Sequence, residues 1–239
     1  MEASDEFKPF DGCSLESWTG SAQKRDGRGG AGCWAQTGDI SELEFKWTDA
    51  EVWVTRTNSM IDAARRNLSV AAMTESAGCQ SPIQTYWPVR FRTQLDLMHY
   101  ASYLLTVLHA GGTTAATTGP LLGTTAFFAD DARGDGQPRG MSHARLWEPY
   151  TWDLGAPIVV HSNVTMYEAQ SQPSVYVRYF ELAVVVVNPS NASAASAMEL
   201  DGAPYEDRLT GEQGIRSVQM PPHTGRVLLR TKPQAWQNN

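Results

Sequence analysis

Leu182-Ala183-Val184-Val185-Val186-Val187 is the longest apolar run of the chain, and Asn188-Pro189-Ser190 follows it directly. A run of this length suits a β-strand and falls far short of the roughly 20 residues that a membrane span requires. Asparagine, proline and serine are typical of turns. We therefore predict a strand that ends in a turn, and we expect no membrane partner, because no other apolar run is longer.

The rest of the C-terminal part has the same strand character. Three further segments are rich in β-branched, aromatic or long apolar residues: 175–180, 215–220 and 226–229. Asp201-Gly202 and Thr210-Gly211 have the composition of turns. No helical pattern follows Pro157. We therefore predict that residues 158–239 form an all-β domain, a small antiparallel β-sandwich.

The N-terminal part alternates strand-like and helix-like segments. Strands are predicted over residues 10–17, 68–73 and 124–128, and helices over residues 48–66 and 95–108. Thr48-Asp49-Ala50-Glu51 has the form of a capping box, which starts the first helix at Thr48. An apolar face of this helix is predicted from the spacing of Val52, Trp53, Met60, Ile61 and Ala64.

This alternation predicts the fold class. Strands that alternate with helices pair in parallel, with the helices as crossovers. A complete (β/α)8 barrel takes about 250 residues, so only part of one fits before residue 157. We expect an α/β plus all-β protein: the C-terminal half of a (β/α)8-type barrel over residues 1–157, followed by the β-sandwich.

Composition and charge exclude several classes of protein. Apolar residues make up 41% of the 239 residues and charged residues 19%, which indicates a folded chain. The net charge of -7 disfavours nucleic-acid partners, because an acidic surface repels phosphate backbones. The start of the chain is acidic and polar, unlike a signal or transit peptide, so no compartment is assigned. The histidines form neither an HExxH motif nor a cluster with cysteine, so we expect no metal site.

Three of the predicted strands lead into carboxylates. Glu16 ends the first, Glu75 follows the second, and the pair Asp130 and Asp131 follows the third. Ligands of parallel α/β folds bind at the carboxyl ends of the strands. Hydrolysis of a glycosidic bond uses two such acids, one as proton donor and one as nucleophile or base. A single acid here would be read as a solvated loop residue, but three in the same position favour a site.

Tryptophan supplies a second signal. Seven of the eight tryptophans lie at or before residue 152, and four of them fall in predicted loops or after strands: Trp18, Trp34, Trp87 and Trp147. A flat aromatic face suits the apolar face of a sugar ring, and the indole N–H offers a hydrogen-bond donor. Core packing is the other explanation, and we assign it to Trp53.

Several segments resemble glycoside hydrolase-like (β/α)8-barrel proteins that carry a C-terminal antiparallel β domain. Phe10-Asp11-Gly12-Cys13-Ser14-Leu15-Glu16-Ser17 is similar to a barrel strand of that family, and residues 47–75 to the barrel unit after it. Residues 150–157 are similar to the passage from barrel to β domain. The strongest similarity is C-terminal, over residues 177–190, 200–211 and 221–229.

The resemblance implies roles for the strand-end acids. Glu16 would be the nucleophile or base, where the family usually has aspartate, and Glu75 would be the acid. Residues that would bind substrate are Asp11, Trp18, Trp34, Trp87, Asp130 and Asp131. The first half of the barrel has no counterpart in this sequence.

Three functional hypotheses follow. The first is a glycoside hydrolase-like protein that acts on an oligo- or polysaccharide by two-carboxylate acid/base catalysis, without a cofactor. The second is a non-catalytic carbohydrate- or protein-binding module derived from such a fold. The third is a structural subunit whose incomplete α/β half pairs with a missing N-terminal segment or with another chain, since open parallel edges invite pairing.

Overall fold

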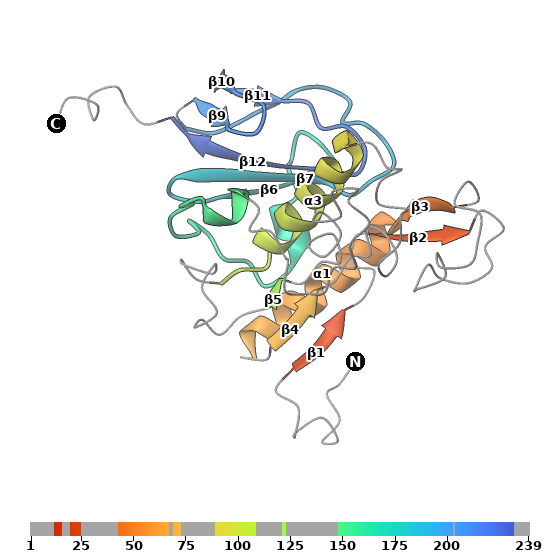
Figure 1. The fold of residues 1–239 in the computed structure, drawn as a ribbon. Helices are drawn as coiled ribbons and strands as arrows, with labels where there is room; N and C mark the ends of the chain where they lie inside the picture. Colours follow the sequence, from red (N-terminus) through yellow and green to blue (C-terminus); the bar gives the residue numbers. More distant parts are fainter. Residues whose placement is uncertain are drawn as a thin grey trace.

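A computed structural model describes most of the C-terminal part of the chain and several segments of the N-terminal part. The described residues are 12–15, 20–24, 43–66, 69–72, 89–108, 121–122, 148–202 and 204–231. Figure 1 shows the two long helices and the short N-terminal strands on one side of a larger C-terminal sheet. No helix within these residues is long and apolar enough to cross a bilayer.

The N-terminal strands form a small parallel sheet. Its order is β1-β4-β5, with β1 at Gly12–Leu15, β4 at Ser69–Ala72 and β5 at Leu121–Leu122. Helix α1 (Ala50–Arg65) separates β1 from β4 along the chain, and α3 (Val89–Leu104) separates β4 from β5. The predicted parallel pairing with a helical crossover is therefore confirmed for β1 and β4, and β5, which was not predicted, pairs parallel with β4. The described strands do not show a barrel, and the predicted strand over residues 124–128 lies outside the described residues.

A hairpin that the sequence analysis did not predict lies between β1 and α1. Its strands are β2 (Gly20–Lys24) and β3 (Leu43–Trp47), which pair antiparallel with Gly20 opposite Trp47. The polar composition of β2 hides it from a search for apolar runs. Pairing with the more apolar β3 stabilises β2 as a strand, although the sequence of β2 alone does not indicate one.

Helix α1 follows its prediction with two corrections. Its N-cap is Asp49 rather than Thr48, and the Asp49 side chain makes no capping hydrogen bond. The buried face consists of Trp53, Thr57, Met60, Ile61 and Ala64. Val52, predicted to belong to it, is 40% exposed. The buried face runs from Trp53 to Thr57, which lies about one helical turn later. A face centred on these two residues leaves Val52 on the side of the helix that faces solvent.

The C-terminal part forms a five-stranded antiparallel sheet and a separate two-stranded pair. The sheet has the order β10-β9-β12-β7-β6, and the pair joins β8 to β11. The bounds are β6 Tyr176–Tyr179, β7 Ala183–Asn188, β8 Met198–Glu199, β9 Tyr205–Asp207, β10 Glu212–Ile215, β11 Ser217–Val218 and β12 Thr224–Arg230.

The antiparallel β character predicted for this part is confirmed, and several details differ. The strand predicted over residues 215–220 is divided between β10 and β11, and β8 and β9 were not predicted. Two 3-10 helices, η5 (Glu148–Thr151) and η6 (Val164–Tyr167), flank the start of this part. Because η6 is a single turn, it lacks the length over which a helical pattern becomes visible in a sequence.

Strand β7 lies inside the sheet and is buried along its whole length. Ala183, Val185 and Val187 belong to the core that includes residues of α3, while Val184 and Val186 belong to the core that includes Met198 and Val218 of the β8–β11 pair. Successive side chains of a strand point to opposite faces, so both faces of β7 are covered. One face of the sheet therefore packs on a second layer of strands, as in a sandwich, and the other packs on helix α3.

Residues from both predicted domains, 1–157 and 158–239, meet in one core. Trp53 of α1 packs against Tyr176 of β6 with ring centroids 4.9 Å apart. The Trp53 indole N–H also donates to the Ser102 hydroxyl of α3 at 3.0 Å. The division at residue 157 stays a prediction, but the elements on its two sides share hydrophobic contacts.

Helix α3 approaches β12 most closely at Gly225. A Cβ atom added to Gly225 would overlap the Leu97 carbonyl oxygen of α3 and would lie 2.7 Å from the Ala101 side chain. Beside this contact, the Gln94 side-chain amide donates to the carbonyls of Pro222 and His223 at 3.2 and 3.0 Å. The absence of a side chain at Gly225 therefore sets the distance between helix and sheet.

We predict that Gly225→Ala destabilises the protein by about 2 kcal/mol, because overpacking forces the helix and the sheet apart. Chemical denaturation followed by circular dichroism measures the change in the free energy of unfolding. Gly211→Ala is the control: nothing lies within 4 Å of its added Cβ, and only its positive φ of 76° opposes the change. A Gly225→Ala variant as stable as the wild-type protein would contradict the packing argument.

His223, in the turn before β12, stacks on Trp47 of β3 with ring centroids 4.9 Å apart and an interplanar angle of 9°. Burial lowers the pKa of His223 below its usual value of 6.5, although the hydrogen bond with the Pro189 backbone and the charge of Asp49 act in the opposite direction. The unfolded chain therefore takes up this proton at a higher pH than the folded chain does. The contribution of His223 to stability is present above pH 6.5 and decreases as the pH falls below that value.

We predict that His223→Asn reduces the loss of stability between pH 7 and pH 5. Asparagine tolerates the positive φ of 48° at this position and does not titrate. The free energy of unfolding of both proteins, measured by denaturant titration across this range, gives the two slopes. Identical slopes would show that His223 does not contribute to the pH dependence.

Candidate functional site

The predicted site residues lie beyond what the structure describes. Outside the described residues are Asp11, Glu16, Trp18, Trp34, Glu75, Trp87, Asp130 and Asp131. The strands that precede the two predicted catalytic acids are described. Strand β1 ends at Leu15, directly before Glu16, and β4 ends at Ala72, shortly before Glu75. Leu15 and Ala72 pair in the parallel ladder, so the carboxyl ends of the two strands are level.

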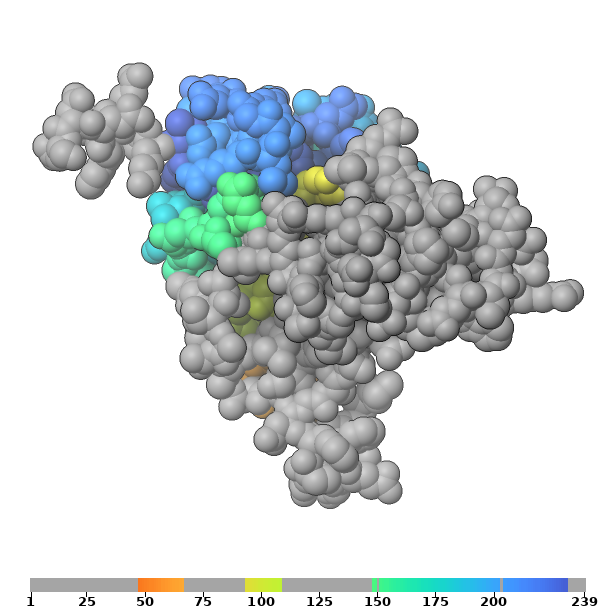
Figure 2. Space-filling view, in the orientation of Figure 1, coloured from red at the N-terminus to blue at the C-terminus, as the bar shows by residue number. Residues whose placement is uncertain are grey.

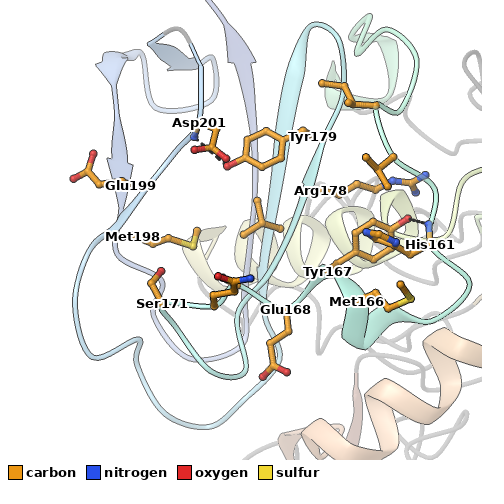
Figure 3. A pocket seen from close by; sticks show the side chains of 15 residues that line it. His161, Met166, Tyr167, Glu168, Ser171, Arg178, Tyr179, Met198, Glu199 and Asp201 are labelled. Carbon is orange, nitrogen blue, oxygen red and sulfur yellow. Dashed lines mark hydrogen bonds between the residues drawn. The ribbon is translucent and has the colours of Figure 1, made fainter.

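The described residues contain an open groove of about 480 Å³ at the edge of the five-stranded sheet (Figure 3). Strand β6 is the outermost strand at this edge. The groove is lined by β6, by the segment from Ile158 to His161, by the end of η6 with the residues after it, and by β8. In the space-filling view, the segments that build the groove belong to the green-to-blue surface at one end of the molecule (Figure 2).

The groove has two sides that differ in chemistry. Figure 3 shows His161, Met166 and Tyr167 on one side of β6, and Met198, Glu199 and Asp201 on the other. The alternation of side chains along β6 explains this division. Tyr176 and Phe180 enter the core shared with α3, whereas Val177 and Tyr179 pack against the core beneath the β8–β11 pair.

Arg178 is a buried cation beneath the groove, with 1% of its surface exposed. One of its terminal nitrogens donates to the Leu104 carbonyl of α3 at 2.8 Å, and its guanidinium carbon lies 5.2 Å from the ring centroids of both Tyr167 and Phe180. Burial lowers the pKa of Arg178. The bond to Leu104 satisfies a carbonyl at the C-terminal end of α3, where a positive charge is favourable. Arg178 thereby joins helix, edge strand and η6.

Tyr167 also contacts the backbone and the ring of His161. The backbone N–H of His161 donates to the Tyr167 hydroxyl at 2.9 Å, and the His161 ring meets the Tyr167 ring edge-on with centroids 4.6 Å apart. The start of η6 is fixed from α1, because the Val164 N–H donates to the Asn58 side chain at 2.7 Å. This side of the groove is therefore attached to two helices, to α1 through Asn58 and to α3 through Arg178.

The opposite side of the groove carries exposed carboxylates. The backbone N–H of Asp201 donates to the Tyr179 hydroxyl at 3.1 Å, and burial raises the pKa of Tyr179. Glu168 accepts a hydrogen bond from the Ser174 N–H at 2.7 Å. Within the described part of the chain, neither Glu199 nor Asp201 forms an ion pair, although the Arg230 guanidinium lies beside Gly202, next to Asp201.

The groove contains no candidate metal site. Among the described residues, no group of three or more histidine, cysteine, aspartate or glutamate side chains could hold a metal ion. The sequence patterns did not predict this groove. Two signals for it exist: the apolar triplet Ile158-Val159-Val160 just after the predicted domain boundary, and the single charged residue Arg178 within an otherwise apolar strand.

Comparisons with known proteins give one weak similarity. No protein-family model matches the chain, and no curated protein sequence matches it. A crystal structure of an Anoxybacillus alpha-amylase, described as giving insights into a new glycosyl hydrolase subclass, matches with a TM-score of 0.31 and 11% sequence identity. The match covers 75% of this chain and 46% of the amylase chain, so it spans less than half of the amylase. A similarity of this size establishes neither the fold nor the activity of this chain.

We predict that Arg178→Ala destabilises the protein by about 3 kcal/mol, because it removes a buried aliphatic stem together with a charged hydrogen bond to Leu104. Arg178→Met should cost only about 1 kcal/mol, since it keeps the stem and removes a buried charge. Denaturant titrations of both variants give the comparison. Equal losses would show that the charge of Arg178, rather than its packing, stabilises the junction.

Proposed function

We propose that the chain is a glycoside hydrolase-like protein that acts on an oligo- or polysaccharide through Glu16 and Glu75. One observation carries this proposal: β1 and β4 are neighbouring parallel strands, and their carboxyl ends are level at the pair Leu15 and Ala72. Glu16 and Glu75 follow these two ends in the sequence. Loops after neighbouring parallel strands meet at one edge of the sheet, which is where α/β folds bind their ligands.

The proposed chemistry divides two roles between two carboxyl groups. Glu75 donates a proton to the departing sugar oxygen, while Glu16 acts as nucleophile or as base toward water. Paired strands run about 4.8 Å apart, and the carboxyl groups of glycosidases lie about 5 to 9.5 Å apart, so residues just beyond paired strand ends suit either stereochemical outcome. The reaction needs no cofactor.

Substrate contacts in this proposal come from the other candidates, of which Trp18, Asp130 and Asp131 follow strands in the sequence and Asp11 does not. Asp11 precedes β1, Trp18 follows it, and Asp130 and Asp131 follow β5. Trp34 and Trp87 would offer further aromatic faces to sugar rings. A tryptophan that stacks on a sugar changes its fluorescence on binding, so each tryptophan can be tested by substitution with phenylalanine.

The second candidate function is a non-catalytic carbohydrate- or protein-binding module derived from such a fold. The groove at the β6 edge favours it, because binding there would need no pair of catalytic acids. The two functions differ in a simple readout. A hydrolase releases reducing ends from its substrate, whereas a binding module saturates with ligand and leaves it intact.

We predict that Glu16→Gln and Glu75→Gln each reduce the hydrolysis of an oligosaccharide that the wild-type protein cleaves by at least about a hundredfold, since each removes an acid or base from the reaction. The release of reducing ends from a panel of labelled oligosaccharides is the measurement. The matched control is Glu51→Gln, which changes an exposed glutamate in the first turn of α1.

Two results would contradict the proposal. Hydrolysis by Glu16→Gln at the wild-type rate would remove Glu16 from the mechanism. Saturable binding of an oligosaccharide by the wild-type protein, with no product above a heat-inactivated sample, would replace catalysis by the binding function. A thermal melt of each variant separates loss of activity from loss of the fold, because a bound ligand raises the melting temperature of a folded protein.

A further inference from the structure

We propose that the groove at the β6 edge binds an acidic sugar, a uronate, whose carboxylate pairs with the guanidinium group of Arg178. This inference rests on the second candidate function, carbohydrate binding without catalysis, and it uses neither Glu16 nor Glu75. Three features of the described residues carry it: a donor edge of Arg178 without an acceptor, a buried cation without a counterion, and a groove that offers both apolar and polar surface.

Arg178 has a complete donor edge without an acceptor. One terminal nitrogen, Nη1, donates to the Leu104 carbonyl. Among the described residues, the Nε and Nη2 atoms have no hydrogen-bond partner, although both atoms are buried. The N–H groups of Nε and Nη2 lie along one edge of the planar guanidinium group, and this edge matches the two oxygens of a carboxylate. The edge therefore has the geometry of a carboxylate receptor.

The positive charge of Arg178 also lacks a counterion. No ion pair between described residues includes Arg178. The rings of Tyr167 and Phe180 lie near the guanidinium group, and their faces attract a cation without neutralising it. Buried charges are normally paired, because an isolated buried charge is costly. The carboxylate of a ligand would supply the missing negative charge.

The groove provides a route to Arg178. Arg178 is one of the lining residues, and Figure 3 shows it beside Tyr167 and His161. Because the Nε and Nη2 atoms are buried, a ligand reaches them only when a neighbouring side chain moves. Ile158 and Met166 also line the groove and are each 57% exposed, so their side chains can change rotamer readily. We expect side chains, rather than the backbone of β6, to move when the ligand enters.

The rest of the groove suits a sugar ring. Ile158 and Met166 offer apolar surface to the C–H groups of a ring face. Glu168, Gln170 and Ser171 are exposed, line the groove and can exchange hydrogen bonds with hydroxyl groups. The groove volume of about 480 Å³ lies within the range of about 300 to 1,000 Å³ that is usual for small-molecule sites. A molecule with one carboxylate, several hydroxyl groups and an apolar face fits these surfaces.

The acidic side of the groove limits the charge of the ligand. Glu199 and Asp201 lie across β6 from His161 and Met166 (Figure 3). Their carboxylates accept hydrogen bonds from hydroxyl groups, but they repel a second negative charge. A single uronate, free or at the end of an otherwise neutral glycan, therefore fits better than a polyanion. A neutral sugar would leave the donor edge of Arg178 without an acceptor.

The test compares galacturonate with its neutral methyl ester by calorimetric titration of the full chain at constant ionic strength. The two ligands share every hydroxyl group and differ in the charge of the carboxyl group. We expect saturable binding of galacturonate and at least about tenfold weaker binding of the ester, because only the ionised carboxylate offers a charged acceptor to both nitrogens. Galactose, which has no carboxyl group, should bind as weakly as the ester.

Variants of Arg178 test the receptor itself. Arg178→Met keeps the aliphatic stem and removes the donor edge, so we expect at least about tenfold weaker binding of galacturonate. Arg178→Lys keeps the charge without the planar edge and should also bind more weakly than wild type. The matched control is Arg208→Met, which removes an exposed arginine outside the groove and should bind within about twofold of wild type. A thermal melt checks that each variant is folded, and the ester comparison decides if Arg178→Met is not.

Four results would overturn the inference. Equal binding of galacturonate and its ester would exclude the carboxylate from recognition, as would unchanged binding by a folded Arg178→Met variant. Equal binding of acetate would show that the edge accepts any carboxylate and does not select a sugar. Binding of galactose as tight as that of galacturonate would leave the carbohydrate-binding function intact and remove only the acidic sugar. Absence of binding by all of these sugars would contradict the inference and remove the support that the groove gives to the second candidate function.

Discussion

Burial of β7 on both faces is the constraint on which the rest of the described structure depends. A strand of alanine and valine can be covered on both sides only if a separate layer reaches each face. The β8–β11 pair reaches one face, and α3 reaches the other. The α3 layer fits because Gly225 of the neighbouring strand β12 lets the helix approach the sheet without a side chain between them.

The position of α3 in turn determines the surroundings of the groove. The C-terminal end of the helix brings the Leu104 carbonyl to Arg178, and Arg178 orders Tyr167 and Phe180 around its guanidinium group. The side of the groove formed by η6 is therefore connected to the central core through one buried cation. The acidic side is formed by β8 and by Asp201, which follows it. Arg178 does not connect this side to α3.

The parallel strands and the antiparallel sheet carry two separate candidate sites. The carboxylate pair at Glu16 and Glu75 stays a proposal from the sequence, which the level ends of β1 and β4 accommodate. The groove at the β6 edge comes from the structure and was not predicted. Acids after predicted strands are visible in a sequence, whereas a groove beside an edge strand depends on how distant segments lie against it.

The sequence by itself determined strand β7, which the structure places one residue later at Ala183–Asn188, helix α1, the parallel pairing of β1 with β4 and the antiparallel nature of the C-terminal part. These follow from local patterns of apolar residues and turn residues, which act within one element or between consecutive elements. Only the tertiary structure decided that α3 covers one face of the sheet, that Val52 faces solvent while Thr57 is buried, and that Arg178 lies beneath a groove. Each of these depends on contacts between residues far apart in the chain, and no local pattern records such contacts.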